Sequence, residues 1–277
     1  MDYALNFKIN DRIFNFDVKS NSFNRGNSVC DLQNPVYSNP HLLENGYIIE
    51  QFPSSWFNDI HKSVRNILWE ALGKPKGFEL ETYHKYVNDE THKKTMDSFR
   101  AGTLGIGGIH LNRLGIDYNV FDSWINKTIN GKNLSCVYKK YHGILNVKHF
   151  WIRVIRPNSG DNNPPHKDTH VKRIKDNVNI YLPLAGSDCN SSLPLIPKTH
   201  MELESEYIVS GSPCYVKGKR FTVPAVVHRD GGLNLITPNP QEKEIMIFDP
   251  HCIHGGGINS NKNTTRVSLE MRFFKEV

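Results

Sequence analysis

The stretch RVSLEMRFF, residues 266–274, is the clearest structural pattern in the chain. Apolar and polar residues alternate along it, and successive side chains of a β-strand point to opposite faces. The apolar set is Val267, Leu269, Met271 and Phe273. The polar set is Arg266, Ser268, Glu270 and Arg272. Four polar groups in a row are costly inside a protein unless they bind each other or a ligand, so we expect one packed face and one functional face.

Other short, strand-like runs begin at about residue 134, and turn residues separate them. They are 135–141, 148–155, 178–184, 207–209, 214–216, 220–223 and 244–248. Many short strands between turns indicate a sandwich or barrel, not a sheet built from βαβ units. We predict a mainly β protein with flanking helices and a double-stranded β-helix (jelly-roll or cupin-like) core.

The first half of the chain has a different character. Residues 4–18 predict a hairpin around Asn10-Asp11, and residues 19–46, rich in Asn, Ser and Pro, predict a loop. Apolar residues at helical spacing predict helices from Pro53 to Ala71 and over 117–130, and a more polar one over 79–100. The glycine-rich stretch 102–108 predicts a loop and a candidate lid. We expect a single domain over 1–277, with a helical, lid and flanking region at 1–133 and the jelly-roll core with the site at 134–277.

Composition narrows the class of protein. The formal net charge is +6, from 34 basic and 28 acidic residues, and the basic residues are scattered, which argues against nucleic-acid binding. The five cysteines form no CxxC pair, which argues against a disulfide framework or a zinc ribbon. No apolar run is long enough to span a membrane, and the N-terminus lacks a signal-peptide pattern, so we expect a cytoplasmic protein.

His166 and Asp168 form an H-x-D pair. On extended backbone both side chains point to one face, close enough to bind one cation. Pro164-Pro165 directly before them stiffens the segment. Alone, the pair also fits an exposed turn, but a distal histidine would complete the two-histidine, one-carboxylate set typical of non-haem Fe(II) sites.

The best distal candidate is His254, which follows a strand-like run and precedes three glycines. His251 and His170 compete for the role, but His254 is better spaced for a hairpin that returns to Arg266. Arg266 and Ser268 would present a cation and a hydroxyl on one face, a pair that suits the far carboxylate of a dicarboxylate. The structural alternative is an ion pair between Arg266 and Glu270 or another strand's carboxylate.

The order His166-x-Asp168, His254, Arg266-x-Ser268 resembles that of the Fe(II)/2-oxoglutarate-dependent dioxygenases. The segments 193–200 and 254–259 are similar to motifs of the phytanoyl-CoA dioxygenase-like branch. Lys198 stands where that branch usually has glycine. The resemblance covers roughly residues 135–274.

The resemblance implies Fe(II) at His166, Asp168 and His254, with 2-oxoglutarate anchored by Arg266 and Ser268 and O2 at the remaining position. It implies oxidative decarboxylation to succinate and CO2, coupled to hydroxylation, desaturation or cyclisation. Because Asp168 is a carboxylate, halogenation is not expected.

Weaker candidates for contact with 2-oxoglutarate are Asn179, Tyr181 and Arg153, each of which could instead be an ordinary surface or ion-pair residue. The rival enzyme is a cupin-like metal enzyme that does not use 2-oxoglutarate, and the rival binding module is a lectin. The expected substrate is a small molecule such as an amino acid or a natural-product intermediate, with an anionic sugar nucleotide or an acyl thioester as the alternative. The oligomeric state is not predicted.

Overall fold

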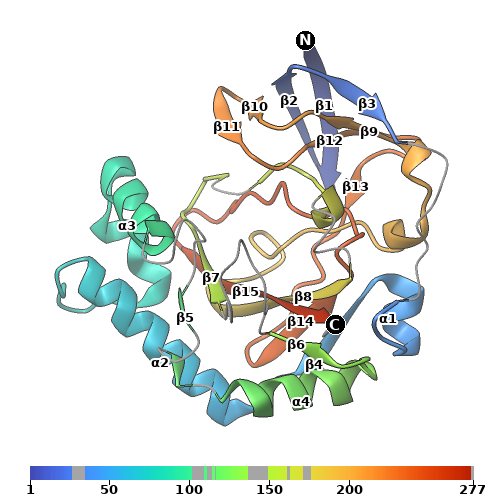
Figure 1. Ribbon diagram of the computed structural model, residues 1–277. Helices are drawn as coiled ribbons and strands as arrows, with labels where there is room; N and C mark the ends of the chain where they lie inside the picture. The colour runs from blue at the N-terminus through green and yellow to red at the C-terminus, as the bar shows by residue number, and fades with distance from the viewer. Residues whose placement is uncertain are drawn as a thin grey trace.

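Residues 266–275 form the central strand, β15 (Arg266–Lys275), of the largest sheet (Figure 1). The computed structural model describes residues 1–26, 35–101, 109–110, 114–115, 117–136, 149–160, 163–170 and 176–275. β15 pairs antiparallel with β8 (Asn177–Ala185) on one side and β7 (His149–Ile155) on the other. The sheet order is β4-β14-β8-β15-β7-β5, and β6 pairs with the end of β15. The other strands of this sheet are β4 (Tyr47–Gln51), β14 (Glu244–Phe248), β5 (Ile109–His110) and β6 (Leu134–Ser135).

The two faces of this sheet differ as the alternation predicts. The apolar face packs against α2 (Ser54–Ala71) and α4 (Tyr118–Ile129), which lie together at one end of the molecule (Figure 1). Phe273 is fully buried there and meets the ring of Phe121 edge to face, with 5.1 Å between ring centroids. The opposite face, with the polar residues of β15, points into the barrel.

A second, shorter layer closes the barrel and is held by isolated backbone bridges. His166 pairs with His254, His254 with Leu195, and Leu195 with Ile236. The carbonyl of Pro165 accepts a hydrogen bond from the amide of Val226. Val226 begins a three-stranded sheet of β12 (Val226–Arg229), β9 (Tyr207–Ser210) and β3 (Phe23–Arg25). Two facing layers of antiparallel strands make the predicted jelly-roll core.

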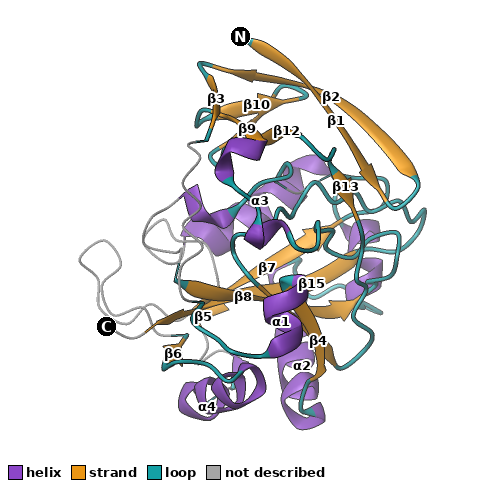
Figure 2. Cartoon of the chain, turned by 90° about the vertical axis from the view of Figure 1, so that its right-hand side faces the viewer, coloured by secondary structure: helices purple, strands orange, loops and turns teal. Residues whose placement is uncertain are grey.

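The N-terminal hairpin, β1 (Asp2–Ile9) and β2 (Arg12–Ser20), matches the predicted one, and Asn10 in its turn has a φ of 52°. It forms a five-stranded sheet with strands from the second half of the chain. These are β10 (Cys214–Val216), β11 (Lys219–Phe221) and β13 (Asn234–Leu235). This sheet lies at the end of the molecule opposite α2 and α4 (Figure 2).

Two predicted elements of the first half are different in the structure. The region 19–46 contains β3 and a short helix, α1 (Pro40–Asn45), which Asn39 caps through its side chain. The predicted helix 79–100 is a 3-10 helix, η1 (Leu80–Tyr86), followed by α3 (Asp89–Ala101). The predicted loop 102–108 and most of the predicted strand 135–141 lie outside the described residues. Within the described ranges, no helix has both the length and the apolar character that a membrane crossing needs.

Candidate metal centre

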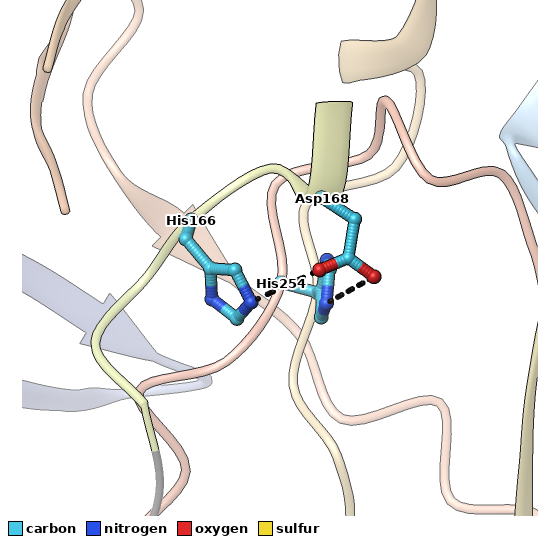
Figure 3. Close-up of side chains that lie close together, drawn as sticks. All are labelled: His166, Asp168 and His254. Carbon is cyan, nitrogen blue, oxygen red and sulfur yellow. Dashed lines mark ion pairs between the residues drawn. The ribbon is translucent and has the colours of Figure 1, made fainter. Parts of the chain in front are cut away.

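The structure brings His166, Asp168 and His254 together in the barrel. All three are buried, and one ligand atom from each lies within 4.8 Å of the others. His166 Nε2 is 3.5 Å from Asp168 Oδ1, and His254 Nε2 is 3.9 Å from Asp168 Oδ2 (Figure 3). Two imidazole nitrogens and a carboxylate oxygen are the donor set that suits non-haem Fe(II) and leaves coordination positions open.

Backbone pairing fixes the two histidines relative to each other. The amide of His166 donates to the carbonyl of His254, and the amide of His254 donates to that of His166, each at 2.9 Å. The amide of Asp168 donates to Pro250 O at 3.1 Å, so the whole H-x-D segment pairs with the segment before the distal histidine. The candidate metal ligands, which are far apart in the sequence, therefore lie side by side through main-chain hydrogen bonds.

Both imidazoles present Nε2 to the centre. His166 Nδ1 lies 2.8 Å from Pro164 O, and His254 Nδ1 lies 3.0 Å from Cys252 O. A carbonyl only accepts, so each Nδ1 carries the proton and each Nε2 keeps its lone pair for a metal. Such outer contacts orient a ligating histidine and are a usual part of metal sites.

The glycines after His254 allow a close approach of two segments. Gly255 has a φ of +97°, and a Cβ there would lie 2.8 Å from Pro164 O and 3.0 Å from His166 Nδ1. Those two atoms make the hydrogen bond that orients the first histidine. A side chain at this position would therefore disturb a ligand as well as strain the backbone.

Asp168 is held by two residues of the inner sheet face. Its Oδ2 accepts from Asn179 at 2.8 Å and from Arg272 at 2.7 Å through Nη2 and 3.2 Å through Nε. Burial favours the neutral acid, but Arg272 and the two imidazoles outweigh it and hold the pKa of Asp168 well below its ordinary value. Asp168 is therefore charged at neutral pH, and Oδ1 is the oxygen left for a cation.

His254 is uncharged at neutral pH. Burial, reinforced by the neighbouring His166, lowers its pKa to about 4. A neutral imidazole is the form that binds a metal. The charge states of His254 and Asp168 are thus already those of a ligand set.

The second feature of the barrel is the polar site around Arg266, whose side chain is fully buried. Arg266 and Ser268, which share one face of β15, define what is called the Arg266 pocket below. Its Nη1 donates to Ser191 O at 2.9 Å, but its Nε and Nη2 have no hydrogen-bond partner among the described residues. The hydroxyls of Ser268 and Ser192 are likewise buried and unpartnered in that part of the chain. Nε and Nη2 lie on one edge of the guanidinium, the edge that a carboxylate binds with both oxygens.

The expected alternative for Arg266, an ion pair with Glu270, is not found. Glu270 instead pairs with Arg153, with 2.9 Å between Nε and Oε2. Among the described residues, no carboxylate forms an ion pair with Arg266, and the guanidinium carbon Cζ lies 5.5 Å from the ring centroid of Tyr181. The Nε and Nη2 donors of the buried Arg266 therefore have no acceptor among the described residues.

The weaker candidates have separate positions. Asn179 binds Asp168 and not the Arg266 pocket. Tyr181 lies beside Arg266 and hydrogen-bonds Ser187 through its hydroxyl at 2.9 Å. Arg153 is paired with Glu270. The competing His251 binds Asp249 through Nδ1 at 2.9 Å and is not in the metal cluster.

The sequence patterns indicate no role for Arg272, Ser191 or Ser192. The alternation along β15 already placed Arg272 on the functional face, but its partner Asp168 could not be read from the pattern. Nothing in the sequence marks the Ser191 carbonyl as the acceptor for Arg266 Nη1, or the Ser192 hydroxyl as a buried group without a partner among the described residues.

No protein-family model matches the sequence, and no curated protein matches it. Among solved structures, EctD from S. alaskensis in its apo form is similar with a TM-score of 0.46 and 12% identity, over 87% of this chain and 82% of that one. The non-heme monooxygenase ThoJ in its apo form gives a TM-score of 0.45 at 10% identity, over 85% and 76% of the two chains. AviO1 from Streptomyces viridochromogenes Tue57 gives 0.43 at 10% identity, over 86% and 93%. These TM-scores are below 0.5, so the likenesses assign no function to this chain.

Proposed function

We propose that this chain is a non-haem Fe(II)- and 2-oxoglutarate-dependent dioxygenase that hydroxylates a small-molecule metabolite. The observation that carries this proposal is the buried Arg266, with two nitrogens that have no partner among the described residues, and the equally unpartnered hydroxyl of Ser268 on the same face of β15. A buried charge without a counter-ion is strongly unfavourable, so the pocket is suited to an anion that enters and leaves. The remote carboxylate of 2-oxoglutarate is such an anion, whereas a cupin-like metal enzyme without this co-substrate has no use for the pocket.

The residues divide into three tasks. His166, Asp168 and His254 would hold the iron, and their protonation states suit it. Arg266 would bind the far carboxylate through Nε and Nη2, with a hydrogen bond from Ser268. Arg272 and Asn179 hold Asp168 Oδ2 in place. When bound, Fe(II) with 2-oxoglutarate and O2 supplies the oxidising power that replaces C–H by C–OH, with release of succinate and CO2.

Membership of the phytanoyl-CoA dioxygenase-like branch is part of the same proposal. It rests on the segments 193–200 and 254–259. Lys198, which stands where that branch usually has glycine, has a φ of 67°. That left-handed conformation favours glycine, which supports the match of this segment.

The substrate in this proposal is a small molecule in the cytoplasm. Scattered basic residues and the lack of a nucleic-acid-binding motif favour a metabolite over a nucleic acid. Hydroxylation is favoured over halogenation because Asp168 fills the position that a halide would need.

Anaerobic visible absorption with Fe(II), before and after 2-oxoglutarate, tests the proposal. We expect a new charge-transfer band in the wild type, no band in His254→Ala, and a band only at much higher 2-oxoglutarate concentration in Arg266→Met. A folded, iron-loaded wild type without the band would refute the use of 2-oxoglutarate and favour the cupin-like alternative.

A further inference from the structure

A second ion pair lies on the inner face of the large sheet, next to the proposed metal centre and separate from it. Arg153 of β7 and Glu270 of β15 meet through Nε and Oε2 at 2.9 Å. Ser268, from the Arg266 pocket, lies directly opposite Arg153 across the strands. On β15, Glu270 lies between Ser268 and Arg272, which binds the metal ligand Asp168. The pair is thus placed between the co-substrate pocket and the metal.

The pair has unused hydrogen-bonding capacity. Glu270 Oε1 and the two Nη atoms of Arg153 make no hydrogen bond to any residue that the structure describes. The two side chains keep 30% and 24% of their surface exposed, so a small molecule can reach them. Burial opposes ionisation of Glu270, but Arg153, together with Arg266 and His254, lowers its pKa, so the carboxylate is charged.

We infer that Arg153 and Glu270 bind the primary substrate, and that this substrate is a zwitterion with an ammonium beside a carboxylate, as in an α-amino acid. The substrate carboxylate accepts from the Nη atoms of Arg153, and its ammonium donates to Glu270 Oε1. The inference rests on the proposed function for the chemistry that follows binding. It assigns Arg153 to the substrate, not to 2-oxoglutarate.

The opposite charges of Arg153 and Glu270 discriminate between the candidate classes of substrate. A sugar nucleotide or an acyl thioester brings several negative charges and no cation, so Glu270 would repel it. A purely cationic amine would meet the Arg153 guanidinium without a compensating anion. A zwitterion matches both charges of the pair and leaves neither buried without a partner. Trp151 lies directly opposite Glu270 across the strands, and its ring centroid is 5.0 Å from Arg272 Cζ.

Calorimetric titration of the Mn(II)-loaded protein with each of the twenty free L-amino acids tests the inference without turnover. The N-acetyl form (an anion) and the methyl ester (a cation) of the tightest binder follow. We expect at least one amino acid to bind, and both derivatives to bind about 10- to 100-fold more weakly. Glu270→Gln should lose the preference over the N-acetyl form, and Arg153→Gln the preference over the ester.

The exchanged pair, Arg153→Glu with Glu270→Arg, is the matched control, because it keeps an ion pair on the same strands. It should keep metal binding and the 2-oxoglutarate band but bind the amino acid more weakly. Binding of no amino acid, or equal binding by the wild type and both single variants, overturns the inference. A wild type that binds an amino acid but shows no 2-oxoglutarate band would refute the proposed function and leave the substrate class standing.

Discussion

Replacing Arg266 by methionine should make the protein more stable in the absence of 2-oxoglutarate. Methionine has a similar length but no charge and no donors. The change removes two buried donors without partners, each of which costs about 1–3 kcal/mol. It also leaves Ser191 O without its donor, which costs about the same as one of them. The net expectation is a gain of about 1–3 kcal/mol in the free energy of unfolding.

Adding 2-oxoglutarate should reverse the order of stability of the wild type and Arg266→Met. A ligand present at 100 times its dissociation constant stabilises the folded state by about 2.7 kcal/mol. Only the wild type can use this stabilisation fully, because the variant lacks the carboxylate-binding donors. The wild type should therefore equal or exceed the variant when the co-substrate is present.

Urea unfolding of both Mn(II)-loaded proteins, with and without 2-oxoglutarate, measures the four free energies. Arg272→Met is the control, because this arginine has a carboxylate partner and its loss should destabilise the protein in both conditions. If Arg266→Met is less stable than the wild type by more than about 1 kcal/mol without ligand, the guanidinium stabilises the fold, and the expected gain in the free energy of unfolding is wrong. If 2-oxoglutarate stabilises both proteins equally, it does not bind at Arg266.

Three further predictions concern the site. Arg272→Ala should weaken Mn(II) binding roughly 10- to 100-fold, because Asp168 loses its orienting partner. Arg272→Lys should recover part of the affinity. A metal titration that shows unchanged affinity in Arg272→Ala would contradict this prediction. Ser268→Ala should raise the dissociation constant of 2-oxoglutarate about tenfold without changing metal affinity, and a calorimetric titration that shows no change would exclude the hydroxyl from the pocket. The pKa of His254 is about 4 in the folded protein and about 6.5 in the unfolded chain, so between these pH values the proton binds mainly to the unfolded chain. The metal-free protein should therefore lose about 3 kcal/mol of stability as the pH falls from 6.5 to 4, and His254→Leu should remove that part of the pH dependence in urea unfolding.

Local patterns predicted those parts of the protein that depend on neighbours in the sequence. The alternation at 266–274 gave a strand with the correct buried face, and helical spacing predicted α2 and α4. The clustering of His166, Asp168 and His254 was expected from the resemblance to the Fe(II)/2-oxoglutarate-dependent dioxygenases and not from a local pattern.

Long-range partners could not be predicted in this way. The contact of Arg272 with Asp168 joins residues 104 positions apart, and the pairing of Arg153 with Glu270 spans 117. The parallel pairing of β1 with β13 leaves no trace in either strand's own pattern. Such contacts depend on how the layers stack, which alternation along one strand does not specify.

The bridge between His166 and His254 has a consequence for how the protein would acquire its metal. Both ligands are locked by main-chain hydrogen bonds, and each imidazole is oriented by a carbonyl of its own segment. None of these contacts involves the ion. We therefore expect folding and metal loading to be separate events, unlike in a zinc finger, where the ion drives folding. The metal-free chain should stay folded, and it should bind and release the metal as the metal concentration changes.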